Sequence, residues 1–106
     1  MTRIKNTQGI SLIIMRPTAY TKCVIGQDWY KNELEISFVP NDVYPDYMEV
    51  DSYIMGSIDG AELNIEDVVN TIFNFLLEKY QPKDLEVADH IRGCKTHFNV
   101  DVIKTM

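Results

Sequence analysis

A single amphipathic helix, bounded by Asn64 and Pro82, constrains the fold of this chain more than any other segment. Its apolar side chains recur three and four residues apart, which places them on one helix face: Ile65, Val68, Val69, Ile72, Phe73, Leu76 and Tyr80. Asn64 can cap the first turn, Lys79 suits the negative end of the helix dipole, and Pro82 prevents continuation. The spacing predicts a helix over residues 65–79 whose apolar face must pack on another layer.

Alternating hydrophobicity predicts that this other layer is a β-sheet. In residues 29–39, Leu34, Ile36 and Phe38 alternate with polar residues. This is the period of a strand with one face in water. Pro40 ends the segment, so a strand is expected over residues 29–39.

Three further segments have the character of strands. Residues 10–15 are a short apolar run, and we expect them to form a buried strand. Residues 85–88 and 98–102 alternate in the same way as residues 29–39. Arg92-Gly93 is the expected connection between these last two strands.

A second, shorter helix is expected over residues 47–57. The elements then follow in the order strand, strand, helix, helix, strand, strand. This order predicts an α+β fold in which a four-stranded antiparallel sheet carries both helices on one face. With 106 residues and 45% hydrophobic content, residues 1–106 make one domain with one modest core.

The charge of the chain argues against a general affinity for nucleic acid. The formal net charge is -6, and the 10 lysines and arginines are scattered singly along the sequence. A small neutral ligand suits such a surface better than RNA does. The apolar run near the N-terminus is too short for a secretion signal or a membrane span. We therefore expect a cytoplasmic protein in which Cys23 and Cys94 are free thiols.

One group of residues offers donor atoms that zinc prefers: His90, Cys94 and His97. However, His90 and Cys94 flank an expected turn, and a fourth ligand is not evident in the sequence. A polar turn followed by a solvated strand face explains the same residues. We expect no metal.

Four short segments occur in order along the chain: residues 23–30 (CVIGQDWY), 48–52 (MEVDS), 64–70 (NIEDVVN) and 90–94 (HIRGC). They resemble motifs of the QueF family of NADPH-dependent 7-cyano-7-deazaguanine reductases. Residues 23–30, CVIGQDWY, resemble its Cys-Pro-x-Thr-Gly-Gln-Pro-Asp-Phe segment. Residues 48–52, MEVDS, resemble its Val-Glu-Ser-Lys-Ser. Residues 64–70, NIEDVVN, resemble its Phe-His-Glu-Asp-Val-Val-Asn helix start, and residues 90–94, HIRGC, resemble its Thr-Pro-Arg-Gly-Gly turn.

The resemblance implies a tunnelling fold, whose subunits close into a ring or barrel with ligand sites between neighbours. In this family a cysteine thiolate attacks the nitrile carbon of 7-cyano-7-deazaguanine and forms a thioimide, while an aspartate handles the proton on nitrogen. NADPH then reduces the thioimide to the aminomethyl product in queuosine biosynthesis. Cys23 and Asp28 match these two catalytic residues.

The resemblance also implies residues that bind the substrate ring. Glu66 matches a glutamate that accepts the adjacent N–H donors of a guanine-like ring, and a carboxylate can accept two donors side by side. Trp29 or Tyr30 could stack on the ring or belong to the core. The other positions matched to substrate binding are Glu49, Val50 and Ile65.

Several positions depart from the family pattern. Cys23 and Asp28 are five residues apart instead of seven, and an ungapped alignment puts Lys22 in the nucleophile position. Ile65 replaces a histidine. Residues 51–54, DSYI, replace a Lys-Ser-Leu-Lys stretch whose cations suit NADPH phosphates. NADPH therefore stays only a possible cofactor, and the positions matched to it are Arg92 and Gly93.

These departures keep three functions open. The first is a QueF-like enzyme that acts on the nitrile through a cysteine thioimide and reduces it. The second is a QueF-like amidinotransferase, in which ammonia attacks the thioimide and the substrate base sits in tRNA. The third is a non-catalytic tunnelling-fold protein that binds a purine or pterin.

Overall fold

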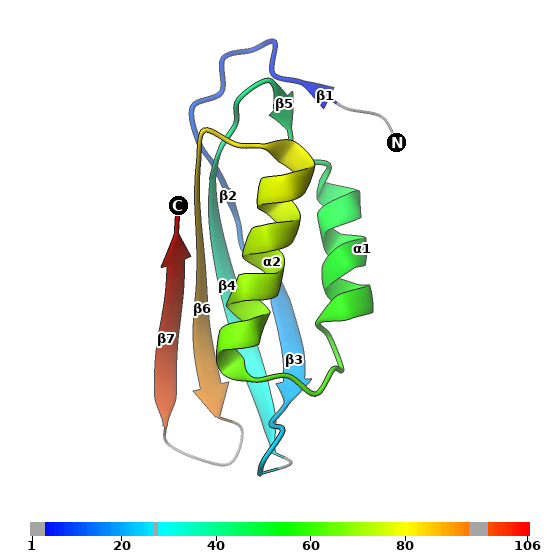
Figure 1. Ribbon diagram of the computed structural model, residues 1–106, viewed down its shortest axis with the longest axis vertical. Helices are drawn as coiled ribbons and strands as arrows, with labels where there is room; N and C mark the ends of the chain where they lie inside the picture. Colours follow the sequence, from blue (N-terminus) through cyan, green and yellow to red (C-terminus); the bar gives the residue numbers. More distant parts are fainter. Residues whose placement is uncertain (1–3, 27, 94–97) are drawn as a thin grey trace.

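The computed structural model describes residues 4–26, 28–93 and 98–106. Its elements follow in this order: β1 (Ile4–Lys5), β2 (Ile13–Met15), β3 (Thr18–Lys22), β4 (Trp29–Val39), β5 (Val43–Tyr44), α1 (Tyr47–Ser57), α2 (Ile65–Tyr80), β6 (Asp84–Gly93) and β7 (Asn99–Thr105). Figure 1 shows α1 and α2 over one face of the main sheet, and the rings of Tyr53 and Phe75 stack between the two helices at 3.9 Å. The chain therefore has the predicted α+β fold with both helices on one side.

The main sheet is antiparallel and four strand positions wide. β2, β4, β6 and β7 lie in that order, and β3 pairs with β4 beyond the end of β2. β1 and β5 form a separate two-stranded ladder. The predicted sheet is thus present, with its first strand divided in two.

This division corrects the expectation of a buried strand over residues 10–15. Only β2 is extended and paired there, at the sheet edge, where Ile14 is 42% exposed. Pro17 has no N–H to donate and interrupts the ladder, although its carbonyl accepts the Leu34 N–H at 3.0 Å. β3 then resumes the pairing with β4, and its sequence, TAYTK, has too few apolar residues to predict a strand.

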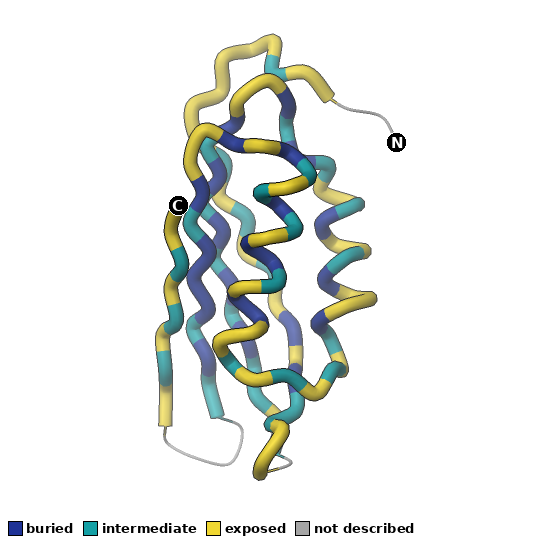
Figure 2. Tube along the Cα trace, in the orientation of Figure 1, coloured by how far each residue is buried: buried dark blue, intermediate teal, exposed yellow. Residues whose placement is uncertain are grey.

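β4 organises the core because it pairs with strands on both sides. The apolar residues of its alternating pattern, Leu34, Ile36 and Phe38, face the helices and are at most 2% exposed. Figure 2 shows this alternation as dark segments along β4 and β6 beneath α2. The buried residues of α2 confirm its predicted apolar face: Val68, Val69, Ile72, Phe73, Leu76 and Tyr80.

One acidic side chain interrupts the apolar face of β6. Asp89 is fully buried and lies opposite Leu34 of β4 and Val102 of β7. Neither of its carboxylate oxygens has a hydrogen-bond partner among the described residues. Burial disfavours the charged form and raises the pKa of Asp89 to about 7.

The helix ends differ in how they are capped. The Asp46 side chain accepts the N–H groups of Met48 and Glu49 at the start of α1. Asn64 occupies the same position before α2, but its side chain makes no capping hydrogen bond, in contrast to the expectation. At the end of α2, Gln81 adopts a left-handed conformation with a φ of 47°. Neither described helix is long and apolar enough to cross a membrane.

Arg92 and Gly93 do not form the predicted connection. They are the last residues of β6, where Gly93 pairs with Tyr30 and Arg92 pairs with Lys31 and Asn99. The alternation of β6 therefore continues further than the sequence indicated, and the connection to β7 falls on residues 94–97, outside the described residues.

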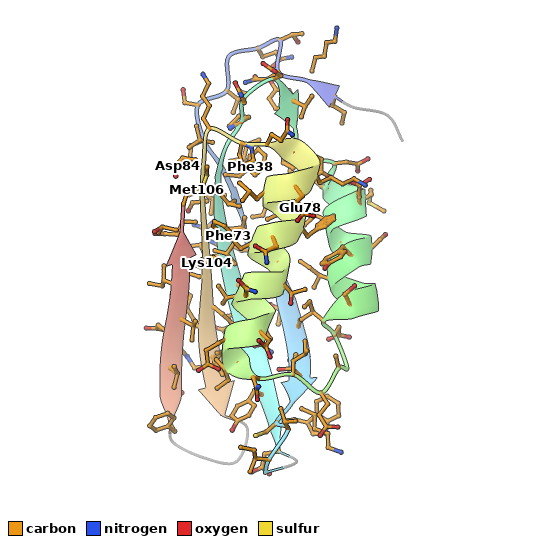
Figure 3. The ribbon with its side chains drawn as sticks, viewed as in Figure 1. Phe38, Phe73, Glu78, Asp84, Lys104 and Met106 are labelled. Atoms are coloured by element: carbon orange, nitrogen blue, oxygen red, sulfur yellow. The ribbon has the colours of Figure 1, made fainter. Side chains whose placement is uncertain are left out.

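The edge strand β7 is attached to α2 by a lysine. Figure 3 shows Lys104 of β7 reaching toward α2, where Phe73 lies. The Lys104 Nζ is 4.7 Å from the centre of the Phe73 ring and donates to the Asn70 Oδ1 at 2.6 Å. A cation–π contact and a charge-assisted hydrogen bond thus hold the sheet edge against the helix layer.

Candidate functional site

The predicted nucleophile, Cys23, lies directly after β3, in the turn that leads to β4. Its backbone N–H donates to the Asp28 carbonyl at 2.7 Å, immediately beyond the paired residues Lys22 and Trp29. This hydrogen bond closes the turn. The backbones of Cys23 and Asp28, the two residues matched to catalysis, therefore lie side by side across it.

The Cys23 sulfur faces hydrogen-bond donors. The Gly26 N–H donates to it at 3.4 Å. The backbone N–H groups of Gly26 and Ile25 lower the pKa of the Cys23 thiol, and Tyr30 adds to this effect, against smaller opposing effects of burial and of Asp28. Because the thiolate is the reactive form, this turn favours a nucleophilic cysteine.

Gly26 separates the thiol from the Asp28 carboxylate. A side chain at Gly26 would begin 3.8 Å from the Asp28 Oδ2 and 3.9 Å from the Cys23 Sγ. The two functional groups therefore flank one position that has no side chain. A reacting group placed beside Gly26 could meet both the sulfur and the carboxylate.

Glu66 lies at the same end of the molecule. Lys22 donates its N–H to the Ala61 carbonyl at 2.9 Å and accepts the Leu63 N–H at 3.2 Å. These hydrogen bonds hold the connection between the helices beside the residue that precedes Cys23, so that α2 begins near the Cys23 turn (Figure 1). Glu66 is exposed in the first turn of α2 and has no hydrogen-bond or ion-pair partner in the described part of the chain.

Ile65, which replaces the family's histidine, is half-buried as the first residue of α2. It can offer only apolar contact to a ligand beside Glu66. Trp29, at the start of β4, is 44% exposed, so a large part of its ring is accessible near the same turn.

Glu49 and Val50 lie at the opposite end of the helix layer, in the first turn of α1. The Glu49 Oε1 accepts a hydrogen bond from the Tyr80 hydroxyl at 2.5 Å and lies 3.5 Å from the Lys79 Nζ. Val50 is a core residue. A single chain thus brings together Cys23, Asp28 and Glu66 but leaves Glu49 and Val50 at the other end.

Arg92 and Gly93 are near the Cys23 end of the sheet, because Gly93 pairs with Tyr30. The Arg92 side chain points to the face opposite the helices, where its Nη1 lies 3.6 Å from the Asp101 Oδ1. His90 shares that carboxylate through a 2.8 Å contact, and this hydrogen bond lowers the pKa of Asp101. The Arg92 guanidinium is therefore already engaged by a carboxylate.

The group considered for zinc is only partly described. Cys94 and His97 lie outside the described residues, and His90 contacts Asp101 as stated above. Within residues 4–26, 28–93 and 98–106, no three histidine, cysteine, aspartate or glutamate side chains gather as metal ligands would.

The sequence leaves Tyr30 as either a ring-stacking or a core residue and does not indicate that it lies on the same side of the sheet as Cys23. The sequence did not predict β3, and the position of Tyr30 follows from the pairing of that strand. Once β3 and β4 are paired, Tyr30 is seen to lie opposite Thr21 and therefore on the same side of the sheet as Cys23, two residues further along.

Comparison with known proteins establishes the fold. No protein-family model matches the chain, and no curated protein matches its sequence. Among solved structures, the chain is similar to one described as the archaeosine synthase QueF-Like in the apo form. The likeness has a TM-score of 0.77 at 15% sequence identity and covers 92% of this chain and 95% of the other. The chain therefore has a QueF-like tunnelling fold.

Proposed function

We propose that this chain is a QueF-like enzyme that attacks the nitrile of 7-cyano-7-deazaguanine with the Cys23 thiolate. One observation carries the proposal: the Cys23 thiol, held among hydrogen-bond donors, shares the space beside Gly26 with the Asp28 carboxylate. The exposed Glu66 at the same end of the molecule adds a group for the ring.

The proposed step forms one bond. The Cys23 sulfur donates an electron pair to the nitrile carbon, and one π bond of the C≡N group becomes a lone pair on nitrogen. The proton lost by the Cys23 thiol reaches that nitrogen through the Asp28 carboxylate, which lies beside Gly26, and gives a neutral thioimide. The Gly26 N–H, which donates to the sulfur before the attack, is released as the sulfur loses its charge.

Glu66 is proposed to hold the ring. Its carboxylate stands in the first turn of α2 and can accept two adjacent N–H donors of a deazaguanine. Trp29 supplies exposed aromatic surface at the same end of the molecule. Trp29 alternates with Tyr30 along β4 and therefore lies on the sheet face opposite the helices, so Glu66 alone is assigned to the ring.

The described residues fit NADPH poorly. Arg92 is paired with Asp101, Gly93 belongs to a strand, and the exposed Asp51 stands where cations would meet the cofactor phosphates. We therefore place amidino transfer ahead of reduction. In that reaction ammonia attacks the thioimide carbon and the Cys23 thiolate leaves, which gives an amidine without any redox change. The structural neighbour is described as an archaeosine synthase, which agrees with this order.

We further propose that the active form is a homo-oligomer. Large apolar side chains are exposed at both ends of the subunit, including Ile25 and Phe98 near the Cys23 turn and Met48 beside Glu49. In the described part of the chain, β7 pairs with β6 only and offers a free edge. Joining subunits would cover these surfaces and could bring Glu49 and Val50 of one chain to the Cys23 end of another.

Intact-mass measurement tests the proposed function. Incubation with 7-cyano-7-deazaguanine should increase the mass of the protein by one ligand, Cys23→Ala should abolish the increase, and Cys94→Ala should retain it. Added ammonia should then release an amidine. An NADPH-dependent aminomethyl product would instead establish reduction, and reversible binding that survives Cys23→Ala would indicate a binding protein. A wild-type protein that gains no mass would rule out the covalent mechanism.

A further inference from the structure

Asp89 is a carboxyl group that lacks a partner on the helix-covered side of the sheet. It is 0% exposed, and neither of its oxygens has a hydrogen-bond partner in the described part of the chain. Burial of this kind disfavours the ionised form, which needs a donor or a cation to be stable there. A cation that can reach Asp89 would therefore decide what happens when this group loses its proton.

The register between β6 and β7 identifies such a cation. Asp89 lies directly opposite Val102, and Lys104 lies opposite Val87. Because side chains alternate along a strand, Asp89 and Lys104 are on the same side of the sheet and form a diagonal cross-strand pair. Diagonal neighbours of this kind are within reach of a long side chain. The Lys104 ammonium can therefore meet the Asp89 carboxyl while both strands stay paired.

Lys104 at present contacts α2, through an amide and an aromatic ring. Its Nζ donates to the Asn70 Oδ1 at 2.6 Å and lies 4.7 Å from the centre of the Phe73 ring, in the direction that Figure 3 shows. None of the ion pairs among the described residues includes Lys104. A carboxylate holds an ammonium more strongly than a neutral amide does. Lys104 therefore gains a stronger acceptor as soon as Asp89 ionises.

Among the described residues, Lys104 is the cation that faces Asp89 from a neighbouring strand on the helix-covered side. β4 offers only uncharged side chains there, with Leu34 opposite Asp89. The buried face of α2 is apolar except for Tyr80, which lies in the last turn. Glu66 lies in the first turn of α2 and is exposed.

Two further titratable groups lie near Asp89 on the other side of the sheet. His90 is the next residue of β6, and its Nδ1 lies 2.8 Å from the Asp101 Oδ1 of β7. Burial is the largest cause that raises the pKa of Asp89 to about 7, while His90 opposes it and Asp101 adds to it. These two neighbours therefore act on Asp89 in opposite directions, and the ionisation falls close to neutral pH.

We propose that Lys104 is a proton-dependent switch, which binds Asn70 of α2 while Asp89 is protonated and binds Asp89 once it is ionised. In acid, the ammonium stays on α2 and attaches the edge strand β7 to the helix. As the pH rises, one proton leaves Asp89, its carboxylate accepts the Lys104 ammonium, and the contacts with Asn70 and Phe73 are lost. The free edge of β7 then loses this attachment to α2. The pH thus controls how firmly the edge is held for a neighbouring chain.

NMR of the full chain with labelled lysine side chains tests the switch. Protons above the face of an aromatic ring resonate upfield, so the Lys104 ε-methylene signal reports its contact with Phe73, and Lys104→Met identifies that signal by its loss. In the wild type the upfield shift should be present at about pH 5 and largely lost at about pH 9. In Asp89→Asn, which has no proton to lose at this position, it should be present at both. A wild-type signal that stays unchanged, or an equal loss in Asp89→Asn, overturns the proposal.

A second measurement covers the case in which Asp89→Asn does not fold. In Lys104→Met, the carboxyl titration of Asp89 followed by carbon NMR should have its midpoint about one pH unit higher than in the wild type, because the ionised form has lost its cation. Lys83→Met removes an exposed lysine and should leave the midpoint unchanged. Equal midpoints in Lys104→Met and the wild type would mean that Lys104 does not pair with Asp89. No nitrile takes part in either experiment, so the result is separate from that of the proposed function.

Discussion

The Tyr80 hydroxyl donates a hydrogen bond of 2.5 Å to the Glu49 Oε1 and so joins the end of α2 to the start of α1. The same hydroxyl accepts the Asp46 N–H at 3.3 Å. Burial, followed by the hydrogen bond to Glu49, raises the pKa of Tyr80 far above its ordinary value. Glu49 therefore has a structural role within one chain, whatever it contributes to a ligand.

Removing this hydroxyl should destabilise the fold. Tyr80→Phe leaves the ring in place but deprives the Glu49 carboxylate of a donor, and we expect a loss of about 1–2 kcal/mol in the free energy of unfolding. Urea denaturation measures this loss. Tyr47→Phe removes a hydroxyl from a residue that is 57% exposed and should change stability little. Equal effects of the two substitutions would show that the Glu49 contact contributes nothing.

Asp89 should make stability depend on pH. Its pKa is raised to about 7 in the folded state by burial, whereas the unfolded chain has an ordinary carboxyl. The folded state therefore holds the proton more tightly, and its contribution to stability is full below about pH 4, is lost as the pH rises to about 7, and stays lost above it. His90 opposes the shift and Asp101 adds to it.

The variant Asp89→Asn removes this titration. Relative to the variant, the wild type should lose about 2–4 kcal/mol of stability between pH 4 and pH 8. Urea unfolding at several pH values gives the difference, and Asp51→Asn, at an exposed position, should follow the wild type. Parallel stability curves for the wild type and Asp89→Asn would mean that the pKa of Asp89 is not raised in the folded protein.

Glu66→Gln should weaken binding of the deazaguanine ring. The amide can offer one acceptor where the carboxylate offers two, and it loses the charge, so we expect the dissociation constant to rise by roughly tenfold or more. Calorimetry in a Cys23→Ala background isolates reversible binding from adduct formation. Glu62→Gln, an exposed position at the same end, is the control. Unaltered affinity in Glu66→Gln would remove Glu66 from the site.

Gln81→Gly should stabilise the protein. Gln81 has a φ of 47°, a left-handed conformation that costs a residue with a Cβ atom but not glycine. Gln81 is exposed, so little packing is lost, and a gain of about 0.5–1 kcal/mol is expected. Thermal or urea unfolding measures the gain. Lys83→Gly, two residues further on, should give none, and a loss of stability in Gln81→Gly would contradict the strain argument.

The elements that the sequence predicted well are those with one wet and one dry face. The alternation around Ile36 and the spacing around Ile72 indicate directly which side chains are buried. β4 and α2 match these two patterns closely. β3 was missed because TAYTK places Ala19 and Thr21, a small and a polar residue, on the buried side. Burial there depends on the Asn32 hydrogen bonds, which a hydrophobic pattern does not record.

The residues of the candidate site were also predicted only in part. The motif resemblance predicted Cys23, Asp28 and Glu66 as site residues, and all three lie at one end of the fold. The position of Tyr30 on the Cys23 side of the sheet was not predicted, because it follows from the β3–β4 register. Nor could local periodicity separate Glu49 from Glu66, since both open a helix and only the antiparallel packing of the helices places them at opposite ends.

The break at Pro17 has a consequence for how the protein behaves at high concentration. A sheet edge with an uninterrupted row of donors can add identical strands without limit and lead to fibrils. Here the edge is divided between β2 and β3, because Arg16 and Pro17 lie between the two paired strands. A continuous flat strand cannot follow this edge along its length, so only a partner whose own edge matches the interruption can dock there. The proline thus works against the indefinite addition of identical flat strands at this edge.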